Sequence, residues 1–307
     1  MLRGYKILLF ICVITALISC QDNSKPVESY AKELTVIPSP NKILKRGGTL
    51  SLTNNFWVIA DISDSLTTTL ASYAVNKIST ITGRDVMITD LYSTRKHDQS
   101  VAIELKKKTD NDNAELYTLN LTRNQILLTS SSSSGIKYGI ESLSQLLLKH
   151  RTKDGNYTIG KMVIKDKPAY KIRGIVIDFI QLKEIETSLF RNMQKLKLNT
   201  VIISGEDSKV EELKKLASNY NIKIFQQNDF MSKVMLISIE DDKQNISTFY
   251  NTQKYRPTKD GLLLNLTPID KKFLGVKLTI LAELAWCGYG KIDIDSLSRW
   301  TDRELTW

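Results

Sequence analysis

The segment Ile172-Arg-Gly-Ile-Val-Ile-Asp178 is an apolar run that ends at a carboxylate, as expected for a strand buried in a sheet. Two more apolar strands are predicted downstream, at 198–203 and 221–225, and a helix separates each strand from the next. The apolar residues of these helices recur at helical spacing: Leu189, Met193 and Leu196, then Val210, Leu213 and Ala217. This alternation of strands and helices predicts a parallel sheet.

Upstream, residues 34–168 have the pattern of one α+β unit, a sheet with two helices. Short strands are expected at 34–37, 49–53, 86–88 and 101–105, and Arg123-Asn124 joins 116–121 and 125–129 into a hairpin. Each helix shows one apolar face, formed by Leu66, Leu70, Tyr73 and Ala74 in the first and by Ile136, Ile140, Leu143 and Leu147 in the second. The serines at 130–134 are interpreted as the start of the second helix.

Downstream, residues 229–271 offer two strand-like runs, 234–238 and 262–265. The run Leu281-Ala-Glu-Leu-Ala-Trp286 has helical spacing, so we interpret Trp286 as a core residue and Glu283 as a structural one.

The N-terminus has the features of an export signal. Arg3 and Lys6 precede an apolar run of about a dozen residues, which is too short for a membrane-spanning helix. The order Leu17-Ile-Ser-Cys20 resembles the bacterial lipobox, which implies that residues 1–19 are removed and that Cys20 is lipidated. Residues 20–33 are polar and are expected to form a tether. We therefore expect an exported protein, lipid-anchored to a bacterial membrane on the periplasmic side or the cell surface.

Composition excludes several classes of protein. The formal net charge is +10, but basic residues are scattered and no nucleic-acid-binding motif is found, so no nucleic-acid partner is expected. Beyond Cys12 in the signal and Cys20 at its end, only Cys287 remains, which rules out a disulfide framework and a cysteine zinc site. No cofactor and no metal ion are expected.

Several motifs together resemble family 20 glycoside hydrolases, the β-N-acetylhexosaminidases. Val36-Ile-Pro-Ser-Pro40 with Gly47-Gly48 is similar to the start of their small N-terminal domain, and Gly135-Ile-Lys-Tyr-Gly139 with Ser142-Leu-Ser-Gln-Leu146 to its end. The same accessory domain precedes hyaluronidase-like family 84 enzymes and some α-glucuronidases. The resemblance therefore implies a glycan-processing context but does not define a reaction.

The second half continues the resemblance. The segment 172–178 is similar to the first strand of the family 20 catalytic barrel, and Leu198-Asn199 to the start of the second. Only 135 residues run from Arg173 to Trp307, whereas a closed eightfold barrel needs about 250. The expected fold is therefore an α+β domain (34–168) followed by a shortened (β/α)-barrel-like α/β domain (169–307).

The catalytic motif of the family is absent. The family uses an Asp-Glu pair after a His-x-Gly-Gly segment, with the substrate's acetamide as nucleophile. Here the only histidines are His97 and His150, both before the second domain, and no Gly-Gly pair follows Gly48. The same count excludes histidine-based catalysis in the second domain and leaves carboxylates as the only possible metal ligands there.

The remaining candidate site residues are acidic, apart from one arginine. Glu240, Asp241 and Asp242 follow the run at 234–238, so they are weak catalytic candidates or a plain acidic turn. Glu206-Asp207 resembles the Asp-Asp pair of family 84 enzymes, which implies a second weak catalytic candidate, but the flanking residues of that motif do not match. The resemblance implies that Arg173 binds sugar hydroxyls together with Asp178. The alternative for Arg173 is an ion pair with a strand-end carboxylate such as Asp178.

Two functions follow as hypotheses. The first is a lipid-anchored, catalytically inactive relative of β-N-acetylhexosaminidases that binds an N-acetylhexosamine-containing glycan or serves as a scaffold. The second is an active exo-β-N-acetylhexosaminidase whose catalytic carboxylates have moved, to Glu206 and Asp207 or to Asp241 and Asp242. A decayed protein without a selected function is a third possibility.

Overall fold

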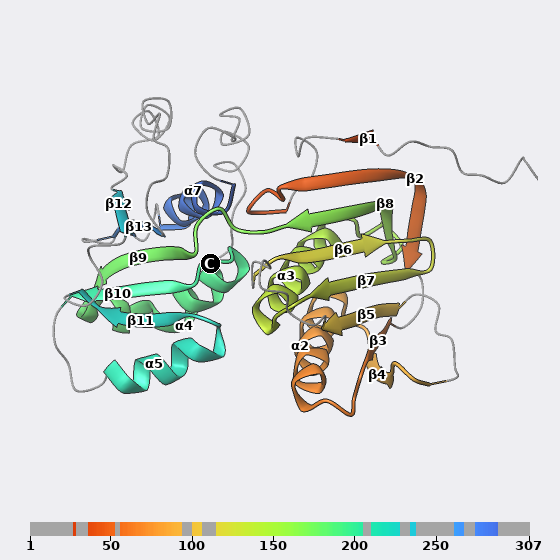
Figure 1. Ribbon diagram of the computed structural model, residues 1–307, viewed down its shortest axis with the longest axis horizontal. Helices are drawn as coiled ribbons and strands as arrows, with labels where there is room; N and C mark the ends of the chain where they lie inside the picture. Colours follow the sequence, from red (N-terminus) through yellow and green to blue (C-terminus); the bar gives the residue numbers. More distant parts are fainter. Residues whose placement is uncertain are drawn as a thin grey trace, which may run out of the picture.

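The computed structural model describes two β-sheets with their helices (Figure 1). The described residues are 27–28, 36–52, 56–93, 100–105, 115–204, 210–227, 234–237, 261–266 and 274–287. Within them, no helix combines the length and the apolar character needed to cross a membrane.

The first sheet has eight strands in the order β1-β2-β8-β6-β7-β5-β3-β4. Strands β1, β2, β8, β6 and β7 pair antiparallel, whereas β7, β5, β3 and β4 pair parallel. The bounds of its strands are β1 (Val27–Glu28), β2 (Lys42–Leu52), β3 (Phe56–Ala60), β4 (Val86–Asp90), β5 (Ser100–Leu105), β6 (Tyr117–Leu121), β7 (Gln125–Ser130) and β8 (Tyr157–Asp166). Strand β1 falls in the segment predicted as a tether.

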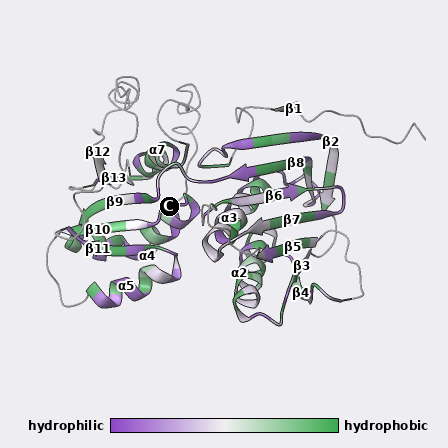
Figure 2. Ribbon diagram, in the orientation of Figure 1, coloured by the Kyte–Doolittle hydropathy of each residue, from purple (hydrophilic) through white to green (hydrophobic). Residues whose placement is uncertain are grey.

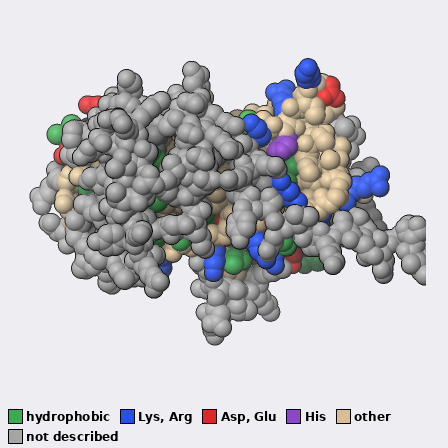
Figure 3. Space-filling model, turned by 90° about the horizontal axis from the view of Figure 1, so that it is seen from above, with side chains coloured by type: hydrophobic (Ala, Val, Ile, Leu, Met, Phe, Trp, Pro, Cys, Tyr) green, Lys and Arg blue, Asp and Glu red, His purple; other side chains and the backbone are tan. Residues whose placement is uncertain are grey.

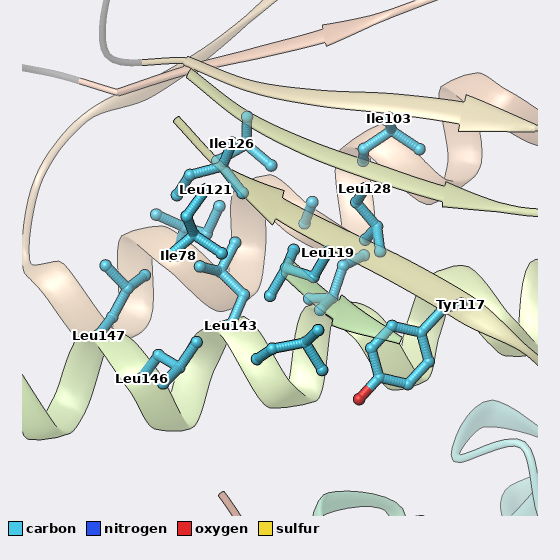
Figure 4. Packing of buried hydrophobic residues seen from close by; sticks show 14 of the residues in the cluster. Ile78, Ile103, Tyr117, Leu119, Leu121, Ile126, Leu128, Leu143, Leu146 and Leu147 are labelled. Carbon is cyan, nitrogen blue, oxygen red and sulfur yellow. The ribbon is translucent and has the colours of Figure 1, made fainter. Parts of the chain in front are cut away.

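Two helices, α2 (Ser65–Thr82) and α3 (Ser133–Lys149), pack on one face of this sheet. Figure 4 shows how Leu143, Leu146 and Leu147 of α3 lie against strand residues such as Leu119 and Leu121. Ser132 caps α3 by accepting a hydrogen bond from the Gly135 backbone N–H, as the serine run predicted.

The second glycine of the Gly135-Ile-Lys-Tyr-Gly139 motif lies where α3 packs against β7. A Cβ at this position would lie 2.2 Å from Cδ1 of Leu128 on β7, a separation that real Cβ atoms do not show. Only glycine lets this turn of α3 approach the sheet so closely.

The second sheet is parallel and has the order β11-β10-β9-β13-β12. Its strands are β9 (Ile172–Asp178), β10 (Thr200–Ser204), β11 (Lys223–Gln226), β12 (Val234–Ile237) and β13 (Gly261–Asn265). Helices α4 (Phe179–Lys195), α5 (Val210–Asn219) and α7 (Leu274–Cys287) pack their apolar residues on one face of it. The hydropathy colouring of Figure 2 shows the mainly apolar strands of this sheet beside helices with hydrophilic outer faces.

Among the described residues, the opposite face of the second sheet carries a thin apolar layer. Val176, Ile202 and Leu263 are buried there, with Ile172 and Phe225 partly buried beside them. The strands alternate, so residues two apart point to the same face. Val176 and Asp178 therefore share this face, whereas Arg173, Ile175 and Ile177 point toward the helices.

Helix α7 connects the two domains. Its apolar residues pack in the second domain, but Trp286 belongs to the core of the first and is fully buried, as predicted. The Glu283 carboxylate accepts hydrogen bonds from the Ser39 backbone N–H and hydroxyl, which agrees with the structural role expected for it.

Candidate functional site

Strand β9 carries both residues that the sequence suggested for sugar binding, and it places them at opposite ends. Arg173 lies near the amino end, which faces the first domain, and Asp178 lies at the carboxyl end, which points away from it (Figure 1). Because their positions differ by five, strand alternation also puts them on opposite faces of the sheet. The sheet does not bring these two side chains together.

Arg173 is fully buried between the domains. Its Nη1 and Nη2 donate to the two carboxylate oxygens of Glu115 at 2.8 and 3.0 Å, which is the bidentate geometry that guanidinium groups favour. Nη2 also donates to the Tyr138 hydroxyl (3.1 Å), Nη1 to the Tyr170 carbonyl (2.7 Å) and Nε to the Lys197 carbonyl (3.0 Å). Burial opposes its charge, but Tyr138 and Glu115 more than compensate, so the pKa of Arg173 is raised.

A second buried ion pair lies beside the first. Lys197 Nζ and Asp166 Oδ2 are 3.0 Å apart, and neither side chain is exposed. The Asp166 carboxylate also accepts hydrogen bonds from the Tyr117 hydroxyl (2.7 Å) and the Trp286 indole N–H (2.7 Å). The indole ring lies between the two cations, with its centroid 4.5 Å from Lys197 Nζ and 5.1 Å from Arg173 Cζ.

These contacts give Arg173 an ion pair, with Glu115 rather than with Asp178. The guanidinium has no exposed surface and lies at the amino end of the strand, whereas barrel active sites lie at the carboxyl ends. The geometry thus favours a structural role, and a sugar contact by Arg173 stays a prediction.

The carboxyl edge of the second sheet is polar. Asp178, Ser204 and Asn265 end β9, β10 and β13 on the face that carries the thin apolar layer, and each is partly exposed. Asp178 and Ser204 are neighbours across the β9–β10 pair, and Asn265 stands beside Val176. Gln226 and Gln227 follow at the end of β11. We refer to Asp178, Ser204, Gln227 and Asn265 as the polar edge.

Two further details define the polar edge. Asp178 caps helix α4, because its Oδ1 accepts a hydrogen bond from the Ile180 backbone N–H at 2.8 Å. In the first turn of the same helix, the Oε1 atom of Gln181 is buried and has no hydrogen-bond partner. An unsatisfied buried acceptor is costly, so a ligand hydroxyl that donated to it would be stabilised. Neither Gln181 nor Asn265 belongs to a known motif, so neither was predicted from the sequence.

The other predicted site residues, Glu206, Asp207, Glu240, Asp241, Asp242 and Cys20, lie outside the described residues. In the described part of the chain, no three His, Cys, Asp or Glu side chains are grouped closely enough to hold a metal ion.

Comparison with known proteins defines the class of this chain. Residues 33–167 match the family description "Glycosyl hydrolase family 20, domain 2". The chain is 26% identical over 184 residues to a beta-hexosaminidase of Vibrio furnissii, covering 59% of this chain and 28% of the relative. It is 37% identical over 67 residues to the beta-hexosaminidase subunit alpha of Mus musculus, covering 22% of this chain and 12% of the relative.

The fold comparison agrees. A mutant beta-hexosaminidase of Streptomyces plicatus in complex with its product GlcNAc superposes with a TM-score of 0.52 at 16% identity, over 70% of this chain and 47% of that chain. A match over 70% of 307 residues must extend beyond the first 168, so the likeness includes part of the second domain.

These matches identify the chain as a glycoside hydrolase relative. More particularly, it is a relative of the family 20 glycoside hydrolases. It spans only about a quarter of the Vibrio furnissii relative and about half of the Streptomyces plicatus enzyme.

Proposed function

We propose that this protein is a membrane-tethered lipoprotein that binds an N-acetylhexosamine-containing glycan at the polar edge without cleaving it. The observation that carries the proposal is the composition of this edge. Its described side chains are one hydroxyl, two amides and one carboxylate, and Gln181, three residues after Asp178, has a buried acceptor without a partner. Sugar hydroxyls and acetamides both donate and accept hydrogen bonds, so this set suits them.

The single described carboxylate of the polar edge argues against hydrolysis. Glycosidases need a group that protonates the leaving oxygen and a second group on the other side of the bond. Asp178 already accepts the capping hydrogen bond of α4 and is partly exposed. The absence of the His-x-Gly-Gly segment from the sequence points the same way.

The relatives support the choice of ligand. The Streptomyces plicatus enzyme binds GlcNAc as its product, and this chain shares the fold of part of that enzyme. We therefore take the N-acetylglucosamine unit as the ligand class to test first.

The second domain is proposed to be an incomplete barrel. Across the sheet the strands stand in the order β11-β10-β9-β13-β12, so β13 and then β12 lie on the side of β9 that is opposite β10. If the strands are numbered along the chain from β9, this order reads 3-2-1-5-4. In a closed barrel the last strand of the chain likewise pairs with the first strand. Only residues 227–233 separate β11 from β12, too few for a strand–helix unit between them.

Binding is tested by titrating N-acetylglucosamine and its β-1,4-linked disaccharide into the full-length protein in detergent, with calorimetric detection. Asp178→Asn should weaken binding about tenfold, because it removes a charged acceptor worth about 1.5 kcal/mol but keeps a residue that caps α4 well. The matched control is Asp64→Asn, the same change at the cap of α2, which should leave binding unchanged. Equal loss in both variants, or no saturable binding, would refute the proposal.

The alternative is an active exo-β-N-acetylhexosaminidase. One observation favours it: Glu206 and Asp207 follow β10 in the sequence, and Asp241 and Asp242 follow β12, so both pairs come after the carboxyl ends of parallel strands. Hydrolysis of an aryl N-acetylglucosaminide that is abolished in Asp207→Asn or Asp242→Asn would establish this alternative. No turnover above a buffer control, together with saturable binding, supports the binding function.

The lipid anchor is tested separately. Metabolic labelling with a radioactive fatty acid should mark the wild-type protein and not Cys20→Ser, which should also leave the membrane fraction after cell lysis. Labelling of Cys20→Ser would contradict lipidation at this residue.

A further inference from the structure

The edge strand β4 and the start of helix α2 carry a concentration of exposed apolar side chains. Nine large apolar side chains are exposed in the part of the chain that the structure describes, and six of them lie within residues 62–92. These six, which we call the apolar corner, are Ile62, Leu66, Met87, Ile88, Leu91 and Tyr92. The spacing of apolar residues predicted Leu66 on the buried face of its helix, yet Leu66 is 49% exposed. Scattered exposed apolar residues are ordinary, but a group of them marks an interaction surface.

Strand pairing and hydrogen bonds place the apolar corner at one edge of the first sheet. Strand β4 pairs with β3 along its whole length. The Leu91 backbone N–H continues this ladder by donating to the Ala60 carbonyl at 2.9 Å, two residues before Ile62. The Ile62 carbonyl in turn accepts a hydrogen bond from the Thr68 hydroxyl at 3.2 Å, which holds Ile62 beside the first turn of α2, where Leu66 lies. Figure 1 shows β4 at the end of the sheet, next to α2.

The backbone of β4 offers hydrogen-bonding groups at the same edge. In the described part of the chain, β4 is the last strand of its sheet and pairs with β3 alone. The Leu91 N–H points toward β3, and this direction alternates along an extended strand, so the N–H and C=O groups of Val86 and Ile88 point outward. The Ile88 side chain is 37% exposed, which shows that the strand is accessible. A second strand can therefore pair with β4.

The opposite end of the same sheet has the features that protect an edge from other chains, namely a short strand, charges and a bulge. Strand β1 has two residues, and β2 beside it carries Lys42, Lys45 and Arg46 and shifts in register just after Lys45. Figure 3 is seen from this end and shows Lys and Arg side chains on its described surface. Strand β4 pairs regularly instead, and its residues 86–89 are uncharged. The β4 edge is therefore the end of the sheet that suits strand addition.

We propose that two copies of this chain pair their β4 strands antiparallel, about a two-fold axis at Ile88. Ile88 then faces its own copy, and Val86 faces Asp90 of the other copy, so the outward backbone groups meet. The charges favour this register, because the two Asp90 residues are offset by about 13 Å along the strand, beyond the Debye length of about 8 Å at physiological ionic strength. An axis at Thr89 would reduce the offset to about 7 Å and bring the like charges together.

The apolar corner suits a second copy of the same chain, because an antiparallel pair of identical strands closes as a dimer. Val86 packs toward the helices, so Ile88, two residues on, faces the same side. The axis is perpendicular to the sheet, so both copies of α2, each with Leu66 in its first turn, lie on one face of the joined sheet. Their apolar side chains supplement a strand pair that would be marginal alone. This interface is separate from the polar edge and does not depend on the glycan function proposed above.

Disulfide formation tests the strand pairing in the full-length protein in detergent, with Cys287→Ser as the background. In an antiparallel hydrogen-bonded pair the two Cα atoms are about 5.5 Å apart, a separation that a disulfide spans. Ile88→Cys should therefore give a covalent dimer on a non-reducing gel after oxidation. The matched control is Leu148→Cys, at a 63% exposed position on α3, which should stay monomeric. Equal dimer yields from the two variants, or no dimer from Ile88→Cys, would overturn the proposal.

Sedimentation velocity of the full-length protein in detergent gives an independent readout. The wild type should show a monomer–dimer equilibrium, and Ile88→Lys should raise its dissociation constant about tenfold or more, because a lysine on an edge strand opposes strand addition. Leu148→Lys is the control and should leave the equilibrium unchanged. Because Ile88 is exposed, Ile88→Lys should also keep the wild-type melting temperature, which separates loss of the dimer from loss of the fold. A wild type that stays monomeric at every concentration, or a dimer that survives Ile88→Lys, would contradict the assignment.

Discussion

The two ends of strand β9 differ sharply in burial and in hydrogen bonding. At the amino end, Arg173 is fully buried and all of its described hydrogen bonds go to protein groups. At the carboxyl end, Asp178 is partly exposed and makes one capping hydrogen bond. A distance of five positions along one strand leads from a group that joins two domains to a group that is accessible to a ligand.

The difference favours a structural role for the arginine of a family motif and places the described ligand-accessible groups at the opposite end of the strand. Arg173 and Gly174 form the Arg-Gly motif by which the strand resembles the family, yet both act in packing. The arginine joins the domains, and the glycine lets β9 and β10 approach. The described groups suited to a ligand lie at the other end of the strand, at Asp178 and its neighbours.

The largest effect is expected for Gly174→Ala. A Cβ at this position would lie 1.7 Å from the Thr200 carbonyl oxygen of β10, and a backbone atom cannot move aside easily. We expect a loss of at least about 5 kcal/mol of unfolding free energy, measured by urea denaturation. The control is Gly160→Ala, where the nearest atom would be 4.0 Å away, and it should cost less than about 1 kcal/mol. Similar stability of the two variants would contradict the packing role.

Lys197→Met should cost about 3 to 4 kcal/mol, because it leaves the Asp166 carboxylate buried without its counter-charge. The fluorescence of Trp286 should change as well, since its indole donates to this carboxylate. Adding Asp166→Asn should recover part of the loss, which a double-mutant cycle measures. Strictly additive costs would mean that the two side chains are not coupled.

Alkaline pH should destabilise the buried side chains around the amino end of β9, which include Tyr117 and Tyr138. Burial raises the pKa of Tyr117 and Tyr138 well above the usual 10.0, so the folded protein keeps phenol protons that the unfolded chain loses above pH 10. The stability that the two protonated tyrosines contribute is fully present below about pH 10. Above that pH, the free energy of unfolding should fall by about 1.4 kcal/mol per pH unit for each tyrosine. Tyr138→Phe should reduce this slope, as measured by urea denaturation at several pH values above 10.

The smallest effect is expected at the carboxyl end. Asp178→Ala should cost about 1 kcal/mol through loss of the α4 cap, and Asp178→Asn only a few tenths. Urea denaturation of both variants checks this. A loss of several kcal/mol in Asp178→Asn would place this end of β9 among the structural parts of the fold.

The spacing of apolar residues predicted the helices and strands in which that spacing is regular. Helix α3 was found from Ile136, Ile140, Leu143 and Leu147, and its start from the serine run. The β6–β7 hairpin and the strands β12 and β13 were also predicted correctly. In each case one local pattern decides between helix and strand.

Strand β8 was not predicted from the sequence, and the reason is physical. Ile159 and Met162 both point into the core although they are three residues apart, because the pairing of β2 with β8 shifts between Lys45 and Thr49. The period of two is therefore broken in the middle of the strand. The strand predicted at 34–37 was wrong in its described half, since Val36 and Ile37 are not in a strand.

The site was less predictable than the fold. The partner of Arg173, Glu115, lies 58 residues earlier, and no local pattern connects the two. Parity along β9 could have excluded Asp178 as that partner, because an odd separation puts the two side chains on opposite faces. Gln181 is recognisable only from its buried, unsatisfied oxygen, which a sequence does not reveal.

The position of Trp286 has a consequence for the synthesis of the chain. All strands of the first sheet have been made once the chain reaches Asp166, but the indole that completes its core and joins Asp166 is made 120 residues later. The first half of a growing chain therefore cannot reach its final packing until α7 has emerged from the ribosome. This delay favours a loosely packed first domain until helix α7 has been made.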